Sequence, residues 1–290
     1  MSAVFWFASG ALFVVMVPVL ALVGWMFFTW AWFALYHRHK RMPHVDGPTW
    51  RLRVLAWGSE SWAIAHLAWW NVYRFVPQAR LAGELPPVIC VHGFTQNASN
   101  FVGISRVLRE GGRGAISVDL GRIGRHPTRY SEPFVKALEH VREHYPDQKL
   151  DIVCHSMGGV VLRQILHDRG DLALRVGTVV TLGTPHHGTG STRGLKLLPE
   201  VRGMRRSSRW IAGLPSLVES LPHARIVTVG ATADYVVYPL DTCHVEGADR
   251  VDIQGTGHGG LLTHWQVFQL VRAVLCGGSV SPGDAATPPL

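Results

Sequence analysis

The chain of 290 residues is poor in cysteine and lacks the residue spacings that hold metals or nucleotides. Its four cysteines show neither a disulfide framework nor a zinc pattern, and no glycine-rich phosphate loop is present. We therefore expect no metal and no cofactor. Cys90 and Cys154 stand in strand-like apolar runs, where cysteine acts as a small hydrophobe, and this favours a reducing compartment.

Charge is also sparse, since only 17% of the residues are charged. The formal net charge is +8, but lysine and arginine are scattered, with local clusters at 37–41 and 202–209. This distribution indicates no nucleic-acid partner, and anionic lipid suits such clusters equally well. A hydrophobic content of 47% suits one globular domain with an apolar appendage.

The appendage is the stretch from Ala3 to Tyr36, which contains no charged residue. Because about 20 apolar residues cross a bilayer core, we expect residues 1–36 to be a transmembrane anchor or a helical hairpin, with Pro18 and Gly24 as the sites of a kink or turn. A cleaved signal peptide fits poorly, since no basic region precedes the run and no small-residue cleavage site ends it.

Residues 37–86 are interpreted as a basic and aromatic juxtamembrane linker. The run from His37 to Arg41 follows the apolar stretch directly, and such a basic excess tends to stay on the cytoplasmic side. We therefore expect a bacterial inner-membrane location with the domain that follows on the cytoplasmic side. Residues 54–76 are rich in tryptophan, and they are either an interfacial helix or a helix packed on the domain.

From Pro87 to Cys276 short apolar runs alternate with longer helical ones, which is typical of an α/β domain with a mostly parallel sheet flanked by helices. Residues 277–290 are expected to be a disordered tail. The predicted strands are 88–91, 115–118, 150–154, 176–182, 226–230 and 251–253, and two of the predicted helices are 131–144 and 158–168.

The segment 150–159 runs from an apolar strand through a tight turn into a helix that begins near Met157. This is the setting of a nucleophile elbow, whose strained turn exposes a serine hydroxyl, here that of Ser156. Such a turn tolerates only small neighbours, and Gly158 meets that requirement. Cys154 departs from the G-x-S-x-G pattern, where the first position is usually glycine.

A serine nucleophile needs a base to take its proton and N–H groups to stabilise the oxyanion that forms. Residues 91–94, Val-His-Gly-Phe, end the first strand of the domain. We predict that the backbone N–H groups of Phe94 and Met157 form the oxyanion hole. His92 is interpreted as a structural residue of this loop.

The base should follow the serine along the chain, in a loop after the last strand. His258 meets this condition, because it precedes the terminal helix and has glycine on both sides, which frees the backbone to place the imidazole. His244 and His264 stand before the last strand and within the following helix, respectively, and are not expected to face the elbow.

The acid that orients this base is expected at another strand end on the same edge of the sheet. Asp234 follows the strand that ends at Gly230 and is the predicted acid. Asp241 is the second candidate and Asp119 the third, because an aspartate elsewhere is usually a cap or a solvated charge.

Several separate blocks, between Pro87 and about Cys276, resemble the small bacterial triacylglycerol lipases of the class 2 type in the α/β-hydrolase superfamily. The blocks are residues 91–94 with 100–101, 153–159, 180–189, 233–237 and 257–262. The resemblance implies a triad of Ser156, Asp234 and His258, with Phe94 and Met157 at the oxyanion hole. The elbow and residues 183–188 are also similar to the lipase-like domain of GPI inositol-deacylases.

Two features depart from the small members of that family, which are secreted and lidless: the apolar N-terminal segment and an insert at 190–222. The insert combines arginines with leucines and a tryptophan, and we interpret it as a cap or lid over the acyl pocket, with a simple surface helix as the alternative. The adjacent His186 and His187 point apart and lack acidic partners, which argues against a metal site.

The sequence therefore predicts a membrane-anchored serine hydrolase, a lipase or esterase, acting on a lipid or small ester. An acyltransferase would use the same triad with an alcohol in place of water. A membrane-tethered scaffold without activity is the remaining alternative, because a fold alone does not prove catalysis.

Overall fold

The computed structural model describes residues 50–73, 84–121, 127–190, 198–206 and 208–277. The predicted membrane segment 1–36 and the predicted tail from residue 278 onward lie outside these residues. Within the described ranges, no helix has the length and apolar character needed to cross a bilayer. The chain divides into two units, and the second, residues 50–290, contains all the described residues.

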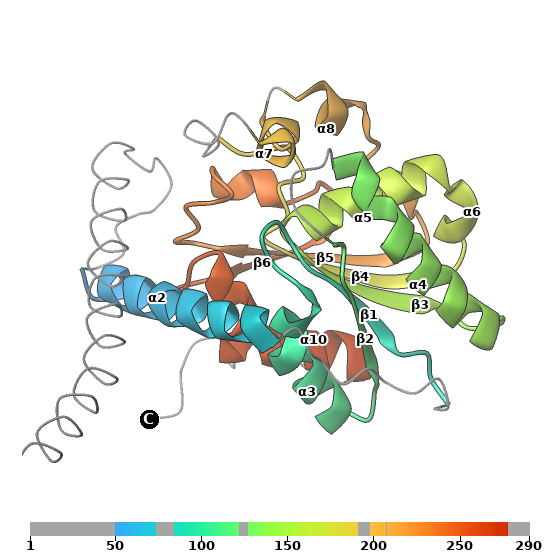
Figure 1. The fold of residues 1–290 in the computed structure, drawn as a ribbon, viewed down its shortest axis with the longest axis horizontal. Coiled ribbons are helices and arrows are strands. Elements are labelled where there is room, and N and C mark those ends of the chain that lie inside the picture. The colour runs from blue at the N-terminus through green and yellow to red at the C-terminus, as the bar shows by residue number, and fades with distance from the viewer. Residues whose placement is uncertain (1–49, 74–83, 122–126, 191–197, 207, 278–290) are drawn as a thin grey trace, which may run out of the picture. The chain divides into compact units, whose positions relative to one another are not determined.

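The centre of this unit is a six-stranded sheet in which every neighbouring pair is parallel, in the order β2-β1-β3-β4-β5-β6 (Figure 1). The predicted parallel sheet is confirmed, and the strand ends differ from the predicted ones by at most two residues. The strands are β1 Val88–Val91, β2 Ala115–Val118, β3 Leu150–His155, β4 Val176–Leu182, β5 Arg225–Ala231 and β6 Asp249–Ile253.

Helices cover both faces of the sheet, as the alternation of apolar runs predicts (Figure 1). Helices α4 (Ser131–His144) and α5 (Met157–Asp168) pack on one face, and α3 (Val102–Glu110) and α10 (Trp265–Cys276) on the other. Each face of the sheet thus has its own hydrophobic core. Side chains of a strand alternate between the faces, so Ile89 of β1 packs in the core with α4 and α5, and Cys90 packs in the core with α3 and α10.

Apart from helix α2, which is described below, the remaining elements are short and lie in the connections between the strands and helices given above. They are the helices α6 Gly170–Ala173, α7 Pro199–Gly203, α8 Arg209–Gly213 and α9 Leu217–Ser220, and the 3₁₀ turns η1 Ala98–Phe101, η2 Pro127–Tyr130, η4 Leu240–Cys243 and η5 Gly259–Leu262.

Residues Trp50–Tyr73 form helix α2, which lies within the range 37–86 that we interpret as a juxtamembrane linker. The helix belongs to the same compact unit as the sheet and contacts η1 and η5. Its buried face carries Ala56, Glu60, Ala63 and Leu67 at helical spacing, so that α2 packs on the domain with one stripe of side chains.

The insert is fastened to the domain by Arg163 of α5. The guanidinium group donates hydrogen bonds to the backbone carbonyl oxygens of Leu214 and Pro215 in the insert and of His186 after β4. Because three separate carbonyl groups share one buried cation, the C-terminal part of the insert has a defined place beside α5.

A pair of glycine-to-alanine substitutions tests the packing of α5 against β1. A Cβ atom at Gly158 would lie 2.6 Å from the carbonyl oxygen of Val91, whereas at Gly58 in α2 it would meet no atom within 4 Å. We expect Gly158→Ala to destabilise the fold by about 1–3 kcal/mol through overpacking. Gly58→Ala should stabilise it by about 0.5–1 kcal/mol through helix propensity.

Chemical unfolding of the full chain measures both changes. Equal stability of Gly158→Ala and the wild type would contradict the close approach of α5 to β1.

Candidate active site

Ser156 occupies a sharp turn between β3 and α5, where its backbone has φ 53° and ψ −124°. A residue other than glycine rarely adopts a positive φ, and such strain is typical of functional turns. The turn is crowded, because a Cβ atom at Gly93 would lie 2.6 Å from the Cβ atom of Ser156. The backbone N–H of Ser156 donates to the carbonyl oxygen of Leu182, 2.8 Å away, and this ties the turn to β4.

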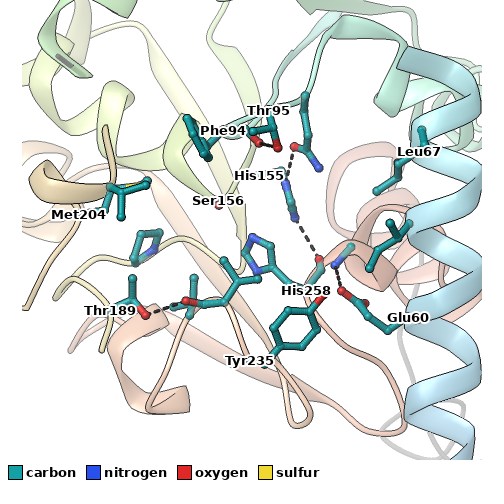
Figure 2. A pocket seen from close by; sticks show the side chains of 18 residues that line it. Glu60, Leu67, Phe94, Thr95, His155, Ser156, Thr189, Met204, Tyr235 and His258 are labelled. Atoms are coloured by element: carbon teal, nitrogen blue, oxygen red, sulfur yellow. Dashed lines mark hydrogen bonds between the residues drawn. The ribbon is translucent and has the colours of Figure 1, made fainter. Parts of the chain in front are cut away.

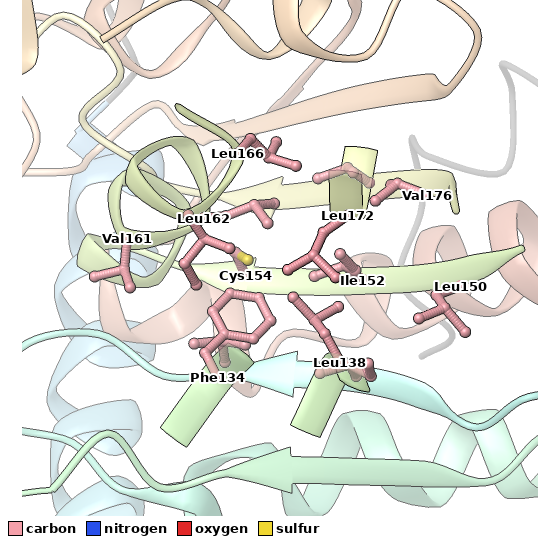
Figure 3. Packing of buried hydrophobic residues seen from close by; sticks show 14 of the residues in the cluster. Phe134, Leu138, Leu150, Ile152, Cys154, Val161, Leu162, Leu166, Leu172 and Val176 are labelled. Atoms are coloured by element: carbon pink, nitrogen blue, oxygen red, sulfur yellow. The ribbon is translucent and has the colours of Figure 1, made fainter. Parts of the chain in front are cut away.

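Cys154, the departure from the G-x-S-x-G pattern, is fully buried among the side chains between β3 and the helices α4 and α5 (Figure 3). Its neighbours there include Phe134 and Leu162. Burial raises the pKa of the Cys154 thiol well above its ordinary value, so the side chain is neutral and acts as a small apolar residue.

His258 and Asp234 form a buried pair in which Nδ1 of the histidine donates to Oδ2 of the aspartate, 2.7 Å away. The other carboxylate oxygen of Asp234 accepts from the backbone N–H groups of Val236 and Val237, each 2.8 Å away. The carboxylate is 4% exposed and is therefore held in one orientation by three donors.

Burial alone lowers the pKa of His258, but the charge of Asp234, the hydrogen bond to it and the charge of Glu60 outweigh burial and raise the pKa above its ordinary value. These neighbours thus stabilise the imidazolium form relative to that of a free histidine, and this is the form that a base reaches after taking a proton.

The structure places Ser156 and His258 in one cavity of about 420 Å³, at the carboxyl ends of the strands (Figure 2). Phe94 lines the same cavity, and Met157 follows Ser156 as the first residue of α5, where helix N–H groups have no partner within the helix. Apolar residues form most of the wall: Ile64, Leu67, Ala68, Phe94, Pro185, Val201, Met204, Val236 and Val237.

The alternative acids and bases lie elsewhere. Asp241 is exposed and forms an ion pair with Arg250, and the carboxylate of Asp119 accepts from the backbone N–H of Gly121. His244 is buried between Thr228 and Asp252.

His264, the other alternative base, is the residue before α10 and does not line the cavity. His92 has the structural role that we expected, because its ring accepts from the N–H of Leu120 and donates to the carbonyl oxygen of Gly93.

Sequence reasoning missed His155, which lies between Ser156 and the loop of His258 (Figure 2). Its ring is fully buried, with Nδ1 2.8 Å from Oε1 of Gln96 and Nε2 3.1 Å from the carbonyl oxygen of His258. Burial, followed by the neighbouring His258, lowers the pKa of His155 well below its ordinary value. The only signal in the sequence is its place beside the elbow serine.

Glu60 is the second residue that sequence reasoning missed. It comes from α2, yet it lines the cavity beside His258 and is 6% exposed. A signal was present, since Glu60 is the one acidic residue between Asp46 and Glu84. A lone carboxylate in an aromatic, apolar helix suggests a buried partner.

Adjacent to the cavity, His186 is buried, and its Nε2 lies 3.1 Å from the hydroxyl of Thr181. Throughout the described part of the chain, no group of three or more histidine, cysteine, aspartate or glutamate side chains is arranged to hold a metal ion.

Residues 88–277, about two thirds of the chain, match the model of the alpha/beta hydrolase family. The chain belongs to the alpha/beta hydrolase family. The matched range of this chain contains the six strands and the residues Ser156, Asp234 and His258, whereas helix α2 lies outside it.

Solved structures of similar fold include two lipases. Lipase B of Aspergillus fumigatus aligns with a TM-score of 0.59 and 15% identity over 70% of this chain and 54% of that one. The mature lipase BlEst2 of Bacillus licheniformis aligns with a TM-score of 0.50 and 17% identity over 69% of this chain and 92% of that one. This chain thus spans about half the length of the fungal lipase. At these identities the likeness shows a shared fold.

The geometry around His258 predicts the effect of removing one charge. Asp234→Asn keeps the shape of the side chain but removes the charge that raises the pKa of His258, so we expect this pKa to fall. NMR titration of the imidazole measures the change, with the signal assigned by its loss in His258→Gln. Asp241→Asn is the matched control and should leave the titration unchanged, because Asp241 is bound to Arg250 instead.

The raised pKa of His258 also determines how the stability of the fold changes with pH. Protonated His258 contributes stability that is complete below the pKa of the unfolded chain and is lost as the pH rises through the folded-state pKa. A pKa of His258 that is the same in Asp234→Asn and the wild type would contradict the pairing.

Proposed function

We propose that the protein is a serine hydrolase of carboxylic esters with Ser156 as nucleophile, His258 as base and Asp234 as the orienting acid. The observation that carries the proposal is the strained Ser156 in the same apolar cavity as His258, whose far nitrogen is bonded to a buried carboxylate. A nucleophile, a base and an orienting group in this order form a complete acyl-transfer site.

In the proposed reaction His258 takes the proton of Ser156 as the serine oxygen attacks the ester carbonyl carbon. The oxyanion that forms is bound by the N–H groups of Phe94 and Met157. The intermediate collapses, and the alcohol leaves with the proton from His258. A water molecule, deprotonated by His258, then attacks the acyl-enzyme. The second intermediate collapses as His258 returns the proton to the oxygen of Ser156, and the carboxylic acid is released.

The wall of the cavity supports an acyl chain as the group held beside Ser156. Leu67 and Ile64 come from α2, and Val201 and Met204 from the insert, so that apolar side chains from both segments meet the cavity. Such a wall gains free energy by covering hydrocarbon. We propose that residues 190–222 act as its cap, and the lipases of similar fold are consistent with this substrate class.

Replacement of the nucleophile tests this proposal. Ser156→Ala in the full chain, purified in detergent, should lower kcat for short p-nitrophenyl esters at least about 10⁴-fold, because no other group supplies the nucleophile. It should also abolish covalent labelling by a fluorophosphonate. The control Ser208→Ala, in the insert and partly exposed, should retain both.

Full activity of Ser156→Ala would contradict the assignment. A wild type that is neither active nor labelled would favour the scaffold without catalysis. Transfer of the acyl group to an added alcohol faster than to water would identify an acyltransferase.

We further propose that residues 1–36 hold the protein in a bacterial inner membrane, with the catalytic domain on the cytoplasmic side. Two features support this: the absence of charge from Ala3 to Tyr36 and the basic cluster that follows. In addition, Leu55, Trp62 and Trp69 form an exposed stripe on α2, and tryptophan suits the interface between lipid and water.

Fractionation tests the anchor. The full chain should stay with membranes in alkaline carbonate, and a chain of residues 37–290 should be released, because it lacks the apolar segment. Protease added to intact spheroplasts should leave the domain uncut. Release of the full chain by carbonate would contradict the anchor, and cleavage of the domain would reverse its side.

A further inference from the structure

The loop that carries His258 is contacted by helix α2, which lies outside the residues that match the family model. Helix α2 lies against η5, the turn that begins immediately after His258. Glu60 of α2 places its Oε1 2.9 Å from the N–H of Gly259 and its Oε2 2.9 Å from the N–H of Gly260. Both carboxylate oxygens therefore accept from successive residues of the loop. Figure 2 shows Glu60 beside this loop.

These two N–H groups open η5, and the first N–H groups of a helical turn lack partners within it. His258 is the N-cap residue of η5, but its side chain makes no capping hydrogen bond, because its Nδ1 is bonded to Asp234. Glu60 thus satisfies two donors that His258 leaves open. Hydrogen bonds to an ionised acceptor are stronger than neutral ones and restrict the loop correspondingly.

The glycines around His258 indicate the same contact. A Cβ atom at Gly257 would lie 2.6 Å from Oε2 of Glu60, and one at Gly259 would contact both Glu60 and Leu67. Neither glycine has a positive φ. The missing side chain of Gly257 therefore leaves room for the carboxylate of Glu60, whereas a Cβ atom at Gly259 would make ordinary van der Waals contacts with α2. We expected both glycines to free the backbone.

The charge of Glu60 also acts on the site. Burial raises the pKa of Glu60 above its ordinary value, and the N–H groups of Gly259 and Gly260 and the charge of His258 oppose this. The groups that face His258 are Asp234 after β5, Glu60 from α2 and the buried His155 at the end of β3. Tyr235, whose pKa is raised by burial and by Glu60, lines the same wall.

We propose that Glu60 is a positioning residue for catalysis: from α2 it holds the His258 loop through Gly259 and Gly260 and adds a second negative charge beside the imidazole. This inference rests on the proposed function, because it concerns the same base. It makes α2, which precedes the matched family region, a part of the working site.

The test measures kcat, KM and the pH profile of the full chain, with active sites counted by fluorophosphonate titration so that unfolded protein is excluded. Glu60→Gln keeps the size of the side chain but removes the charge and one acceptor. We expect kcat per titrated site to fall about 10- to 100-fold, with a smaller change in KM, because the base is misplaced. The acid limb of kcat/KM should move to lower pH, since a negative charge beside His258 is lost.

Glu60→Asp keeps the charge on a shorter side chain. It should lower kcat while leaving the acid limb near its wild-type position, and it is the variant to measure if Glu60→Gln does not fold. A control should match the wild type in both quantities: Glu143→Gln, an exposed glutamate of α4 that does not line the cavity.

An unchanged kcat or an unshifted acid limb in Glu60→Gln would overturn the inference. If only Glu60→Asp folds, the inference is overturned when its kcat equals that of the wild type or when its acid limb is clearly displaced from that of the wild type. Failure of the proposed function itself is seen separately, in a wild type that is not labelled or in an active Ser156→Ala.

Discussion

The close approach of the first turn of α5 to the end of β1 is the constraint on which this molecule depends. Ser156 adopts its strained conformation because Gly93 and Gly158 have no side chains, which lets the two backbones come together around it. The cost of the strain is met by the cores on both sides of the sheet, which hold β3 and α5 in place. The consequence is a serine that lines the cavity at the edge of the sheet.

Around this hydroxyl, two carboxylates control one histidine from different directions. Asp234 is fixed by the N–H groups of Val236 and Val237 and bonds the ring of His258, whereas Glu60 bonds the backbone that follows it. Each buried charge is compensated by N–H donors, and without them its burial would be costly. The ring is thus oriented through its Nδ1 atom and the loop through its peptide groups.

The cavity is completed by segments on either side of the sheet edge. Helix α2 contributes Leu67 and its neighbours, and the insert contributes Val201 and Met204. Arg163 ties the insert to α5, the helix that begins beside the nucleophile. The position of the insert, which forms part of the cavity wall, therefore depends on its hydrogen bonds to α5.

The sequence by itself predicted the six strands, a mostly parallel sheet and the elbow at Ser156. These follow from local periodicity and from small residues at fixed spacing. It also selected Asp234 and His258 from their places after strands, and the structure brings these two together. Only the tertiary structure decided that α2 belongs to the domain and that Glu60 meets the loop of His258. The physical reason is that a contact across about 200 residues leaves no periodic pattern in the sequence. The lone carboxylate of Glu60 suggests a buried partner, but only the packing of α2 shows that the partners are the N–H groups of Gly259 and Gly260.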